Sequence, residues 1–312
     1  MSSEHSEPER VDLRERIALA SLAVPFRVKV GLVWVCIFAV VGVFFALADY
    51  DTDWMRDNVG FVLTGLRYTL LMAFGGIVIA VVLATLGALA RISRNPVAYG
   101  VAGFYVSFFR GTPLIVQMFL IYLALPQVAG NLVDRYPWIG TNVEQRLILS
   151  GAVAGMVALG LNYGAYMTEI FRAGIQSVAQ GQGEAADALG MTYGQKMRKV
   201  VLPQALRVII PPTGNEFIAM MKDTALVSFL GVTAASAEVF RRSQLVGKAD
   251  FKNLEAYVAA ALVFWALTIA FTFVQSRLER RIGRGYDRAH VARAMQAAAQ
   301  QGQPRSGGGV GT

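Results

Sequence analysis

Six long apolar stretches are the feature of this 312-residue chain that most restricts its fold. Three of them, Tyr68–Ala90, Leu147–Thr168 and Ala256–Ser276, contain no charged side chain, and Val28–Ala48 contains only Lys29. An α-helix rises about 1.5 Å per residue, so about 20 residues cross a hydrocarbon core that is about 30 Å thick. A water-soluble protein rarely contains several apolar helices of this length. The chain is therefore predicted to be an all-α integral membrane protein.

Two of the six stretches are less regular. Leu114–Val133 is uncharged, but Pro126 predicts that its helix ends early. Val208–Ala237 contains Pro211-Pro212, which predicts a broken or kinked helix. This stretch also contains three charged side chains, those of Glu216, Lys222 and Asp223. Counted together, the stretches predict six transmembrane helices.

The net charge of +8 indicates topology through the location of its basic residues. Arginines are frequent in the arm 1–27 before the first span and in the segment that follows the last span. Basic residues near span ends are retained on the cytoplasmic side, and an even number of spans returns the chain to its starting face. Both termini are therefore predicted to be cytoplasmic, and no nucleic-acid partner is expected. One predicted outer connection is an exception, because it contains Arg241, Arg242, Lys248 and Lys252.

The two ends of the chain lead to separate expectations. Val28–Ala48 follows a 27-residue polar arm and is longer than a signal-peptide core, so it is interpreted as a retained, additional N-terminal span. The tail 285–312 ends in a Gly- and Gln-rich segment and is expected to be cytoplasmic and disordered. The single Cys36, together with His5 and His290 in the two tails, favours neither a disulfide framework nor a metal site.

A polar segment of 23 residues, Gly181–Pro203, separates two of the apolar stretches. Gln182–Leu189 is predicted to form a short helix, and Gly190 suits a helix C-terminus with positive φ. Thr192 and Gln195 have the spacing of a capping box, which predicts a second short helix. A helix–glycine–helix projection of this kind is expected to be a mechanical contact with a partner. The alternative is an interfacial hairpin that has no partner.

The spacing within this segment resembles a family motif. It resembles the EAA loop of ABC importer permeases. The matching residues are Glu184-Ala185-Ala186, then Gly190 after three residues, Val200 after nine more, and Leu202-Pro203 after one more. The family usually has Ile in place of Val200. The resemblance implies the type I ABC importer transmembrane fold, with a cytoplasmic coupling helix that docks in a cleft of an ATPase. It assigns the coupling role to Glu184, Ala185, Ala186, Gly190, Leu202 and Pro203.

Flanking segments are similar to those of the polar amino-acid permease family. The resemblance covers about residues 60–284, and the family core commonly has five spans, so the span at 28–48 is an addition. The similar segments are Phe109–Leu114, Glu169–Ile175, Leu202–Arg207 and Gly214–Ile218, the last continued by Lys222-Asp223-Thr224.

The chain contains no G-x-x-x-x-G-K-[ST] phosphate loop, so no nucleotide cofactor is expected in it. The resemblance implies that ATP and Mg are bound by separate ABC ATPase subunits. It also implies a second permease subunit, identical or related, and an extracytoplasmic solute-binding protein that delivers the amino acid. The expected location is a bacterial cytoplasmic membrane.

Polar groups at membrane depth are candidates for the substrate path, because they are costly there unless they are paired or line a wet cavity. A zwitterionic amino acid offers a carboxylate and an ammonium group, for which Lys222 and an acidic group such as Glu216 are suitable partners. The alternative is internal pairing of these charges. Glu169 and Arg172 are interpreted as interfacial or gate-coupling residues. The candidates for the path are Asn162, Asn215, Glu216, Lys222, Asp223 and Thr224.

Two other function classes were weighed. A secondary transporter driven by an ion gradient would explain a broken fifth span, but many such folds contain inverted repeats and none is evident here. A membrane-embedded enzyme would need a clustered nucleophile, base or metal set, and the sequence provides no catalytic candidate. A permease subunit of an ATP-driven importer is the favoured hypothesis.

Overall fold

A computed structural model of the chain describes residues 25–139, 142, 145 and 147–301. Every regular element in these ranges is helical. Contacts divide the chain into two compact units, residues 1–54 and 55–312. The first unit contains α2 (Phe26–Leu47) and the start of α3 (Thr52–Leu63), while most of the expected arm 1–27 lies outside the described residues. The second unit contains the remainder of α3 and every described element that follows it.

The segment Asp49–Gly60, which connects the first two apolar stretches, is helical from Thr52 onward. Asp51 explains the start of α3, since its Oδ1 accepts a hydrogen bond from the backbone N–H of Trp54 at 2.9 Å. A side-chain acceptor of this type satisfies one of the free N–H groups at a helix N-terminus.

The core of the second unit is the pair α4 (Leu66–Ile92) and α8 (Gly151–Gln176), which approach closely through glycines. A Cβ at Gly160 would lie 2.6 Å from the side chain of Ile79, and one at Gly87 would lie 2.5 Å from Thr168 Oγ1. Small residues let helix backbones approach and pack when the surroundings are apolar. The interface between these two helices therefore requires its glycines.

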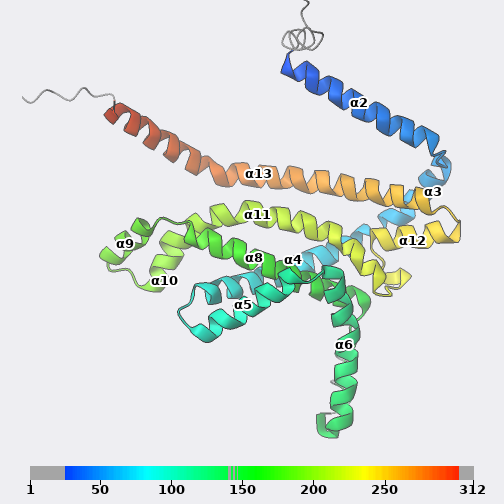
Figure 1. Ribbon diagram of the computed structural model, residues 1–312, viewed down its shortest axis with the longest axis horizontal. Helices are drawn as coiled ribbons and strands as arrows, with labels where there is room; N and C mark the ends of the chain where they lie inside the picture. The colour runs from blue at the N-terminus through cyan, green and yellow to red at the C-terminus, as the bar shows by residue number, and fades with distance from the viewer. Residues whose placement is uncertain (1–24, 140–141, 143–144, 146, 302–312) are drawn as a thin grey trace, which may run out of the picture. The chain divides into compact units, whose positions relative to one another are not determined.

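Other helices pack around this pair (Figure 1). They are α5 (Pro96–Gly111), α6 (Leu114–Arg135), α11 (Leu202–Asp223) and α13 (Asn253–Gln301). Helix α5 precedes the third apolar stretch and begins where Asn95 Oδ1 accepts from Val97 N at 2.9 Å. Figure 1 shows α9 and α10 at the end of α8 and α11 that lies away from α6.

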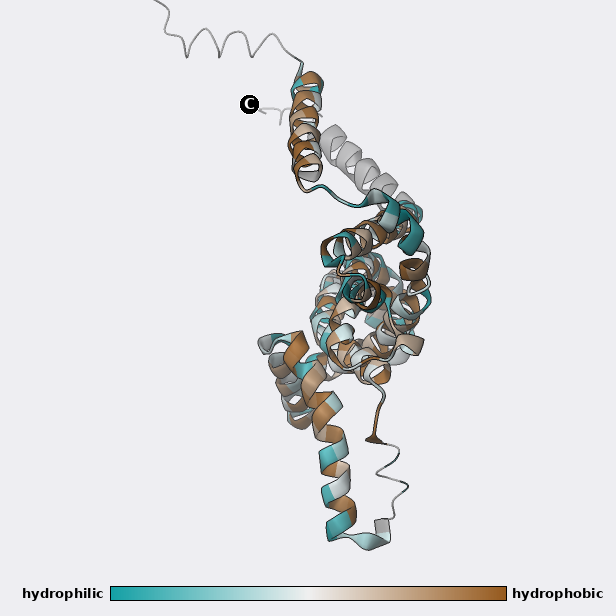
Figure 2. Cartoon of the chain, turned by 90° about the vertical axis from the view of Figure 1, so that its right-hand side faces the viewer, coloured by the Kyte–Doolittle hydropathy of each residue, from teal (hydrophilic) through white to brown (hydrophobic). Residues whose placement is uncertain are grey.

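Large hydrophobic side chains of these helices are exposed, and hydrophobic residues occupy much of their length (Figure 2). On α4, Leu71, Val78, Val82 and Leu86 are all exposed, as expected for a surface that faces lipid. By length and apolarity, α2, α4, α6 and α13 are the four described helices that can cross a membrane. Because α8 and α11 do not meet that threshold, the count of six spans stays a prediction.

Pro126 does not end its helix, contrary to expectation. Helix α6 contains Pro126 and continues to Arg135. A proline removes one backbone donor and leaves one carbonyl without its helical partner, while the bonds on either side persist. Transmembrane helices commonly tolerate such a loss.

The stretch Val208–Ala237 is not one broken span. Helix α11 passes through Pro211-Pro212 and ends at Asp223, where the 3-10 helix η3 (Thr224–Phe229) follows. Gln275 of α13 donates to the carbonyl of Pro211 at 3.1 Å, so a neighbouring helix supplies a polar partner near the prolines. The change of helix type therefore lies at Thr224.

The chain then passes through η4 (Ala234–Ser236) and α12 (Val239–Ala249) before α13. Helix α13 continues to Gln301, so residues 285–301 of the tail 285–312 are helical where disorder was expected. The Gly-rich part, residues 302–312, lies outside the described residues. A short 3-10 helix η1 (Pro137–Ile139) follows α6.

Candidate functional site

The predicted helix–glycine–helix segment is present, and its turn is a Schellman motif. Helix α9 (Gln180–Ala188) ends before Gly190, whose φ is +72°. The N–H of Gly190 donates to the carbonyl of Asp187 at 2.9 Å, and the N–H of Met191 donates to Ala186 at 3.1 Å. These two bonds satisfy carbonyls at the helix C-terminus, and they need a residue that tolerates positive φ. The role predicted for Gly190 as a turn is confirmed.

The second arm begins as predicted but ends differently. Helix α10 (Tyr193–Lys196) starts with a capping box, in which Thr192 N donates to Gln195 Oε1 at 3.0 Å. A π-helix, η2 (Met197–Val201), follows and leads directly into α11. Leu202 and Pro203 therefore continue the helix, whereas they were expected to close the segment. The π turn explains this continuity, because Leu202 N donates to Met197 five residues earlier and Pro203 needs no acceptor.

We name the segment Gln180–Val201 the α9–η2 hairpin. Its two arms are joined by Lys196, whose Nζ lies 2.8 Å from both carboxylate oxygens of Asp187. Ala186 is only 3 % exposed, so it packs within the hairpin. Glu184, Ala185 and Gly190 are exposed. The hairpin therefore keeps its shape through its own contacts.

Two apolar side chains project from the turn of this hairpin, and the sequence reasoning missed both. Leu189 is 77 % exposed and Tyr193 is 66 % exposed. Both are large apolar side chains on an otherwise polar projection. Their position directly beside Gly190 and the capping box was a signal that the sequence contained.

A cavity of about 350 Å³ lies between the α5–α6 junction, α8 and α11. It brings together three of the predicted substrate-path residues, Asn162, Glu216 and Asp223. Its lining includes two carboxyl groups, two tyrosines and an amide, so the cavity is mainly polar. The remaining lining residues are Thr112, Pro113, Leu114, Tyr163 and Tyr166.

Hydrogen bonds between helices hold two of these residues. The Tyr163 hydroxyl donates to Asp223 Oδ2 at 2.8 Å, which joins α8 to α11. Asn162 donates from Nδ2 to Gln117 Oε1 and to the Phe109 carbonyl, each at 3.0 Å. The sequence did not identify Gln117 or Phe109 as functional residues. Their contribution depends on Asn162 of α8, which is distant along the chain.

The other three predicted path residues lie outside the cavity lining. Asn215 is exposed and accepts from Gln275 Nε2 at 2.9 Å. Thr224 is buried and donates to the Met221 carbonyl at 2.8 Å, so it stabilises the junction between α11 and η3. Lys222 is exposed and does not line the cavity. Another cation is in contact with a lining residue: the guanidinium of Arg110 lies over the ring of Tyr166, 5.2 Å from its centroid.

Comparisons with known proteins agree on one family. The model of the binding-protein-dependent transport system inner membrane component family matches residues 76–284. The probable amino-acid permease protein YxeN of Bacillus subtilis is 36 % identical over 236 residues, which cover 76 % of this chain and 97 % of that protein. The arginine transport system permease protein ArtQ, also of Bacillus subtilis, is 36 % identical and covers 72 % of this chain and 94 % of its own length.

One solved structure is similar along most of its length. It is described as a crystal structure of an amino acid ABC transporter with histidines, and it is 35 % identical to this chain. The TM-score is 0.63, and the match covers 74 % of this chain and 98 % of that one. The sequence and structure comparisons thus cover about the same share of the molecule.

Proposed function

The chain belongs to the family of binding-protein-dependent transport system inner membrane components, and on this premise we propose that it is the permease subunit of an ATP-driven importer of polar amino acids. The similar proteins described as amino-acid permeases favour this function over a secondary transporter. The permease alternates between inward and outward access and passes on substrate that an extracytoplasmic binding protein delivers.

The observation that carries the proposal is the α9–η2 hairpin, which serves as the coupling segment. It is a polar projection of defined shape with two large apolar side chains, Leu189 and Tyr193, at its turn. A helix that presents exposed apolar anchors fits a hydrophobic groove of a partner. Glu184, Ala185 and Gly190 contribute the exposed contacts, Ala186 supports the hairpin from within, and Leu202 and Pro203 transmit motion into α11.

The cavity lined by Asn162, Glu216 and Asp223 serves as part of the substrate path. Its two carboxyl groups suit the ammonium group of an amino acid, and the basic side chain of a substrate such as arginine adds a second positive group. The relative ArtQ is described as an arginine transport permease, which is in keeping with this chemistry. Asn215, Lys222 and Thr224 contribute indirectly through the packing of α11.

The remaining arrangement follows from the family. The chain spans a bacterial cytoplasmic membrane six times with both termini in the cytoplasm, and residues 28–48 add one span to a core of five. ABC ATPase subunits bind ATP and Mg and dock on the α9–η2 hairpin. A second permease subunit, identical or related, completes the pathway through the lipid bilayer.

The test is to purify the complex with its ATPase subunits and reconstitute it in lipid vesicles with the binding protein. We expect uptake of a radiolabelled basic amino acid. This uptake should require ATP on the side of the vesicle membrane where the ATPase subunits lie. A complex whose ATPase cannot hydrolyse ATP is the matched control and should give no uptake. Uptake driven by a proton or sodium gradient without ATP would instead support the alternative, an ion-gradient-driven secondary amino-acid transporter.

A further inference from the structure

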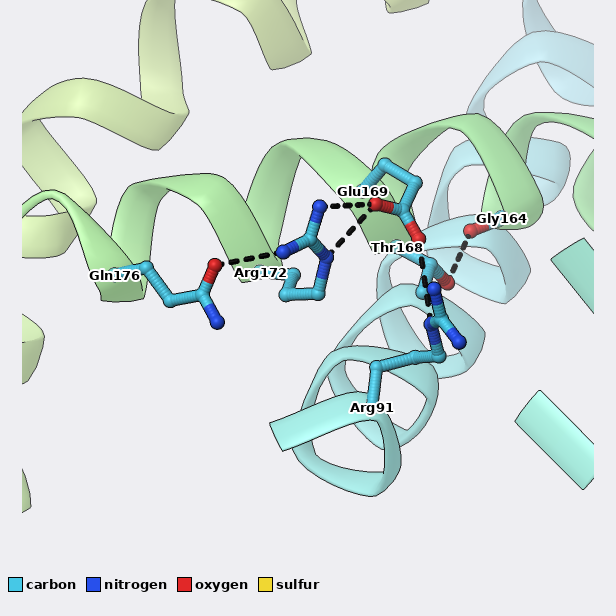
Figure 3. A network of polar contacts seen from close by, with 6 residues as sticks. All are labelled: Arg91, Gly164, Thr168, Glu169, Arg172 and Gln176. Carbon is cyan, nitrogen blue, oxygen red and sulfur yellow. Dashed lines mark hydrogen bonds and ion pairs between the residues drawn. The ribbon is translucent and has the colours of Figure 1, made fainter. Parts of the chain in front are cut away.

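A network of ion pairs and hydrogen bonds joins α4 to the C-terminal part of α8, the helix that precedes the α9–η2 hairpin (Figure 3). Arg91 lies in the last turn of α4, and its Nε is 3.5 Å from Oε1 of Glu169 on α8. The other carboxylate oxygen of Glu169 accepts a hydrogen bond from Arg172 Nε at 2.8 Å and forms an ion pair with Arg172 Nη2 at 2.6 Å. Arg172 also donates from Nη1 to Gln176 Oε1 at 2.6 Å. We name Arg91, Glu169, Arg172 and Gln176 the Arg91 network.

Arg91 also contacts α5. Its guanidinium lies over the ring of Tyr99 at 4.5 Å from the centroid. One of its terminal nitrogens is 3.2 Å from the position that a Cβ of Gly103 would occupy. A guanidinium can stack on an aromatic ring while it pairs with a carboxylate, which an ammonium does less well. Arg91 is therefore the side chain at which α4, α5 and α8 meet.

The network is connected to the hairpin through the end of α8. Gln176 is the last residue of α8, and α9 begins four residues later at Gln180. Ser177 supports this bend, because its hydroxyl donates to the Gly174 carbonyl at 2.8 Å. A displacement of the hairpin is therefore applied to the segment that carries Arg172 and Gln176.

The residue that directly follows α5 lines the cavity, and hydrogen bonds hold it to the last turn of α5. Gln117 donates from Nε2 to the Phe109 carbonyl at 2.9 Å and to Thr112 Oγ1 at 2.7 Å. Thr112 directly follows α5 and lines the cavity. The first half of α5 thus lies against Arg91, and the residue that follows its last turn, Thr112, lies at the cavity.

The contact between Arg91 and Glu169 is incomplete in this conformation. Arg91 Nε and Glu169 Oε1 are both buried and have no hydrogen-bond partner, although they face each other. A buried donor or acceptor without a partner is unfavourable, and an N–H···O bond forms at about 2.7–3.2 Å. A small shift of α4 toward α8 would complete this bond. The free energy of the pair would then be lower in the shifted arrangement than in the arrangement with the 3.5 Å separation.

We propose that Arg91 is a positioning residue that couples movement of the α9–η2 hairpin to α5 and so to the wall of the cavity. The inference rests on the proposed function, because it assigns a route by which ATPase movement reaches the substrate path. Closure of the bond between Arg91 and Glu169 draws α4 and α5 along with α8 when the hairpin moves. The physical basis is a pair of charges that favours one of two arrangements.

The experiment measures substrate uptake per ATP hydrolysed by the reconstituted complex, which separates coupling from assembly. For Arg91→Gln we expect normal recovery of ATPase subunits and continued ATP hydrolysis. We expect uptake per ATP to decrease by about 5- to 150-fold, which is the typical size of coupling between two sites. Exposed Arg94 lies three residues away, so Arg94→Gln is the matched control and should leave the ratio unchanged.

A second pair of variants keeps the test decisive if Arg91→Gln does not fold. Tyr99→Phe retains the aromatic ring beneath the guanidinium, whereas Tyr99→Leu removes it. We expect a lower uptake-to-ATP ratio for Tyr99→Leu only.

The outcomes distinguish the role of Arg91 from the proposed importer function. An unchanged uptake-to-ATP ratio in Arg91→Gln and Tyr99→Leu, with assembly intact, would overturn the role of Arg91 and leave the importer function standing. Absence of ATP-dependent uptake by the unmodified complex would contradict the proposed function itself. Equal losses of assembly, hydrolysis and uptake in Tyr99→Leu and Tyr99→Phe would show a purely structural role and also overturn the inference.

Discussion

Tyr163 and Asp223 are 60 residues apart in the chain, and the hydroxyl of the first donates to the carboxylate of the second at 2.8 Å. The bond joins α8 to the last residue of α11, and both side chains line the cavity. It therefore positions an acidic group at the candidate substrate path.

Removal of this hydroxyl in Tyr163→Phe should change substrate recognition as well as stability. A hydrogen bond to a charged group contributes about 1.5–3 kcal/mol, and its loss frees Asp223 to reorient. We expect a shift in the KM of uptake together with a lower Tm. Tyr105→Phe is the matched control, because the Tyr105 hydroxyl also bonds to α8, at the Leu161 carbonyl, but lies outside the cavity lining. A KM change of equal size in both variants would contradict a specific role for Tyr163.

Substitution of Gly190 should interrupt coupling through the backbone. No atom lies within 4 Å of the position of a Cβ there, so the obstacle is its φ of +72°, which costs most side chains about 1–2 kcal/mol. We expect Gly190→Val to insert in the membrane but to lose ATP-driven uptake, measured in vesicles. Gly190→Asn should retain most uptake because Asn tolerates this conformation, and Gly194→Ala is the control within the same hairpin. Normal uptake by Gly190→Val would count against the coupling role.

The packing of α4 on α8 should be sensitive to a single methyl group. At Gly160 a Cβ would lie 2.6 Å from Ile79 Cβ, so Gly160→Ala should destabilise the protein by about 1–3 kcal/mol through overpacking. Gly100→Ala on α5 is the control, since nothing lies within 4 Å of that Cβ position. Thermal unfolding in detergent measures the difference. Equal Tm values for the two variants would show that α4 and α8 adjust freely.

Stability should fall as the pH rises, because of Glu238 at the start of α12. Complete burial raises the pKa of Glu238 to about 8, although the N–H groups of Phe240 and Arg241 that donate to its carboxyl oppose this rise. Since the folded-state pKa exceeds the ordinary glutamate pKa of 4.5, the stabilisation is fully present below pH 4.5 and is lost as the pH rises to about 8. The Tm measured from pH 5 to pH 9 should decline less in Glu238→Gln than in Glu184→Gln, an exposed control. Identical profiles would contradict the expectation.

Two of the four basic residues that are exceptions to the charge-based topology, Arg241 and Arg242, have a tertiary explanation. Arg241 donates from Nε to the Val232 carbonyl at 3.2 Å, and Arg242 donates to Ala237 at 3.3 Å. The Arg242 guanidinium also lies over the ring of Phe61 at 5.0 Å. These arginines satisfy carbonyls of an irregular segment and cover an aromatic ring, so they stabilise local structure. The counting rule for loops does not include such contacts.

The hairpin was predictable because its chemistry is local. Positive φ at Gly190 and the capping box at Thr192 depend on residues within a few positions, and both predictions are confirmed. The cavity was only partly predictable. Polarity selected Asn162, Glu216 and Asp223, but it selected Asn215, Lys222 and Thr224 equally, and only neighbouring helices separate the two groups. The continuation of α6 and α11 through prolines was missed for the same reason.

By itself, the sequence determined that the chain is helical and apolar, where its helices cap and turn, and which family it resembles. Hydrophobic runs, glycine φ and capping bonds act over a few residues, so one chain segment contains all the information they need. The tertiary structure decided which polar groups share a cavity and that Arg91 joins three helices. These relationships depend on the rotation and separation of helices that are distant in sequence, which are set by close packing such as that of Gly160 on Ile79.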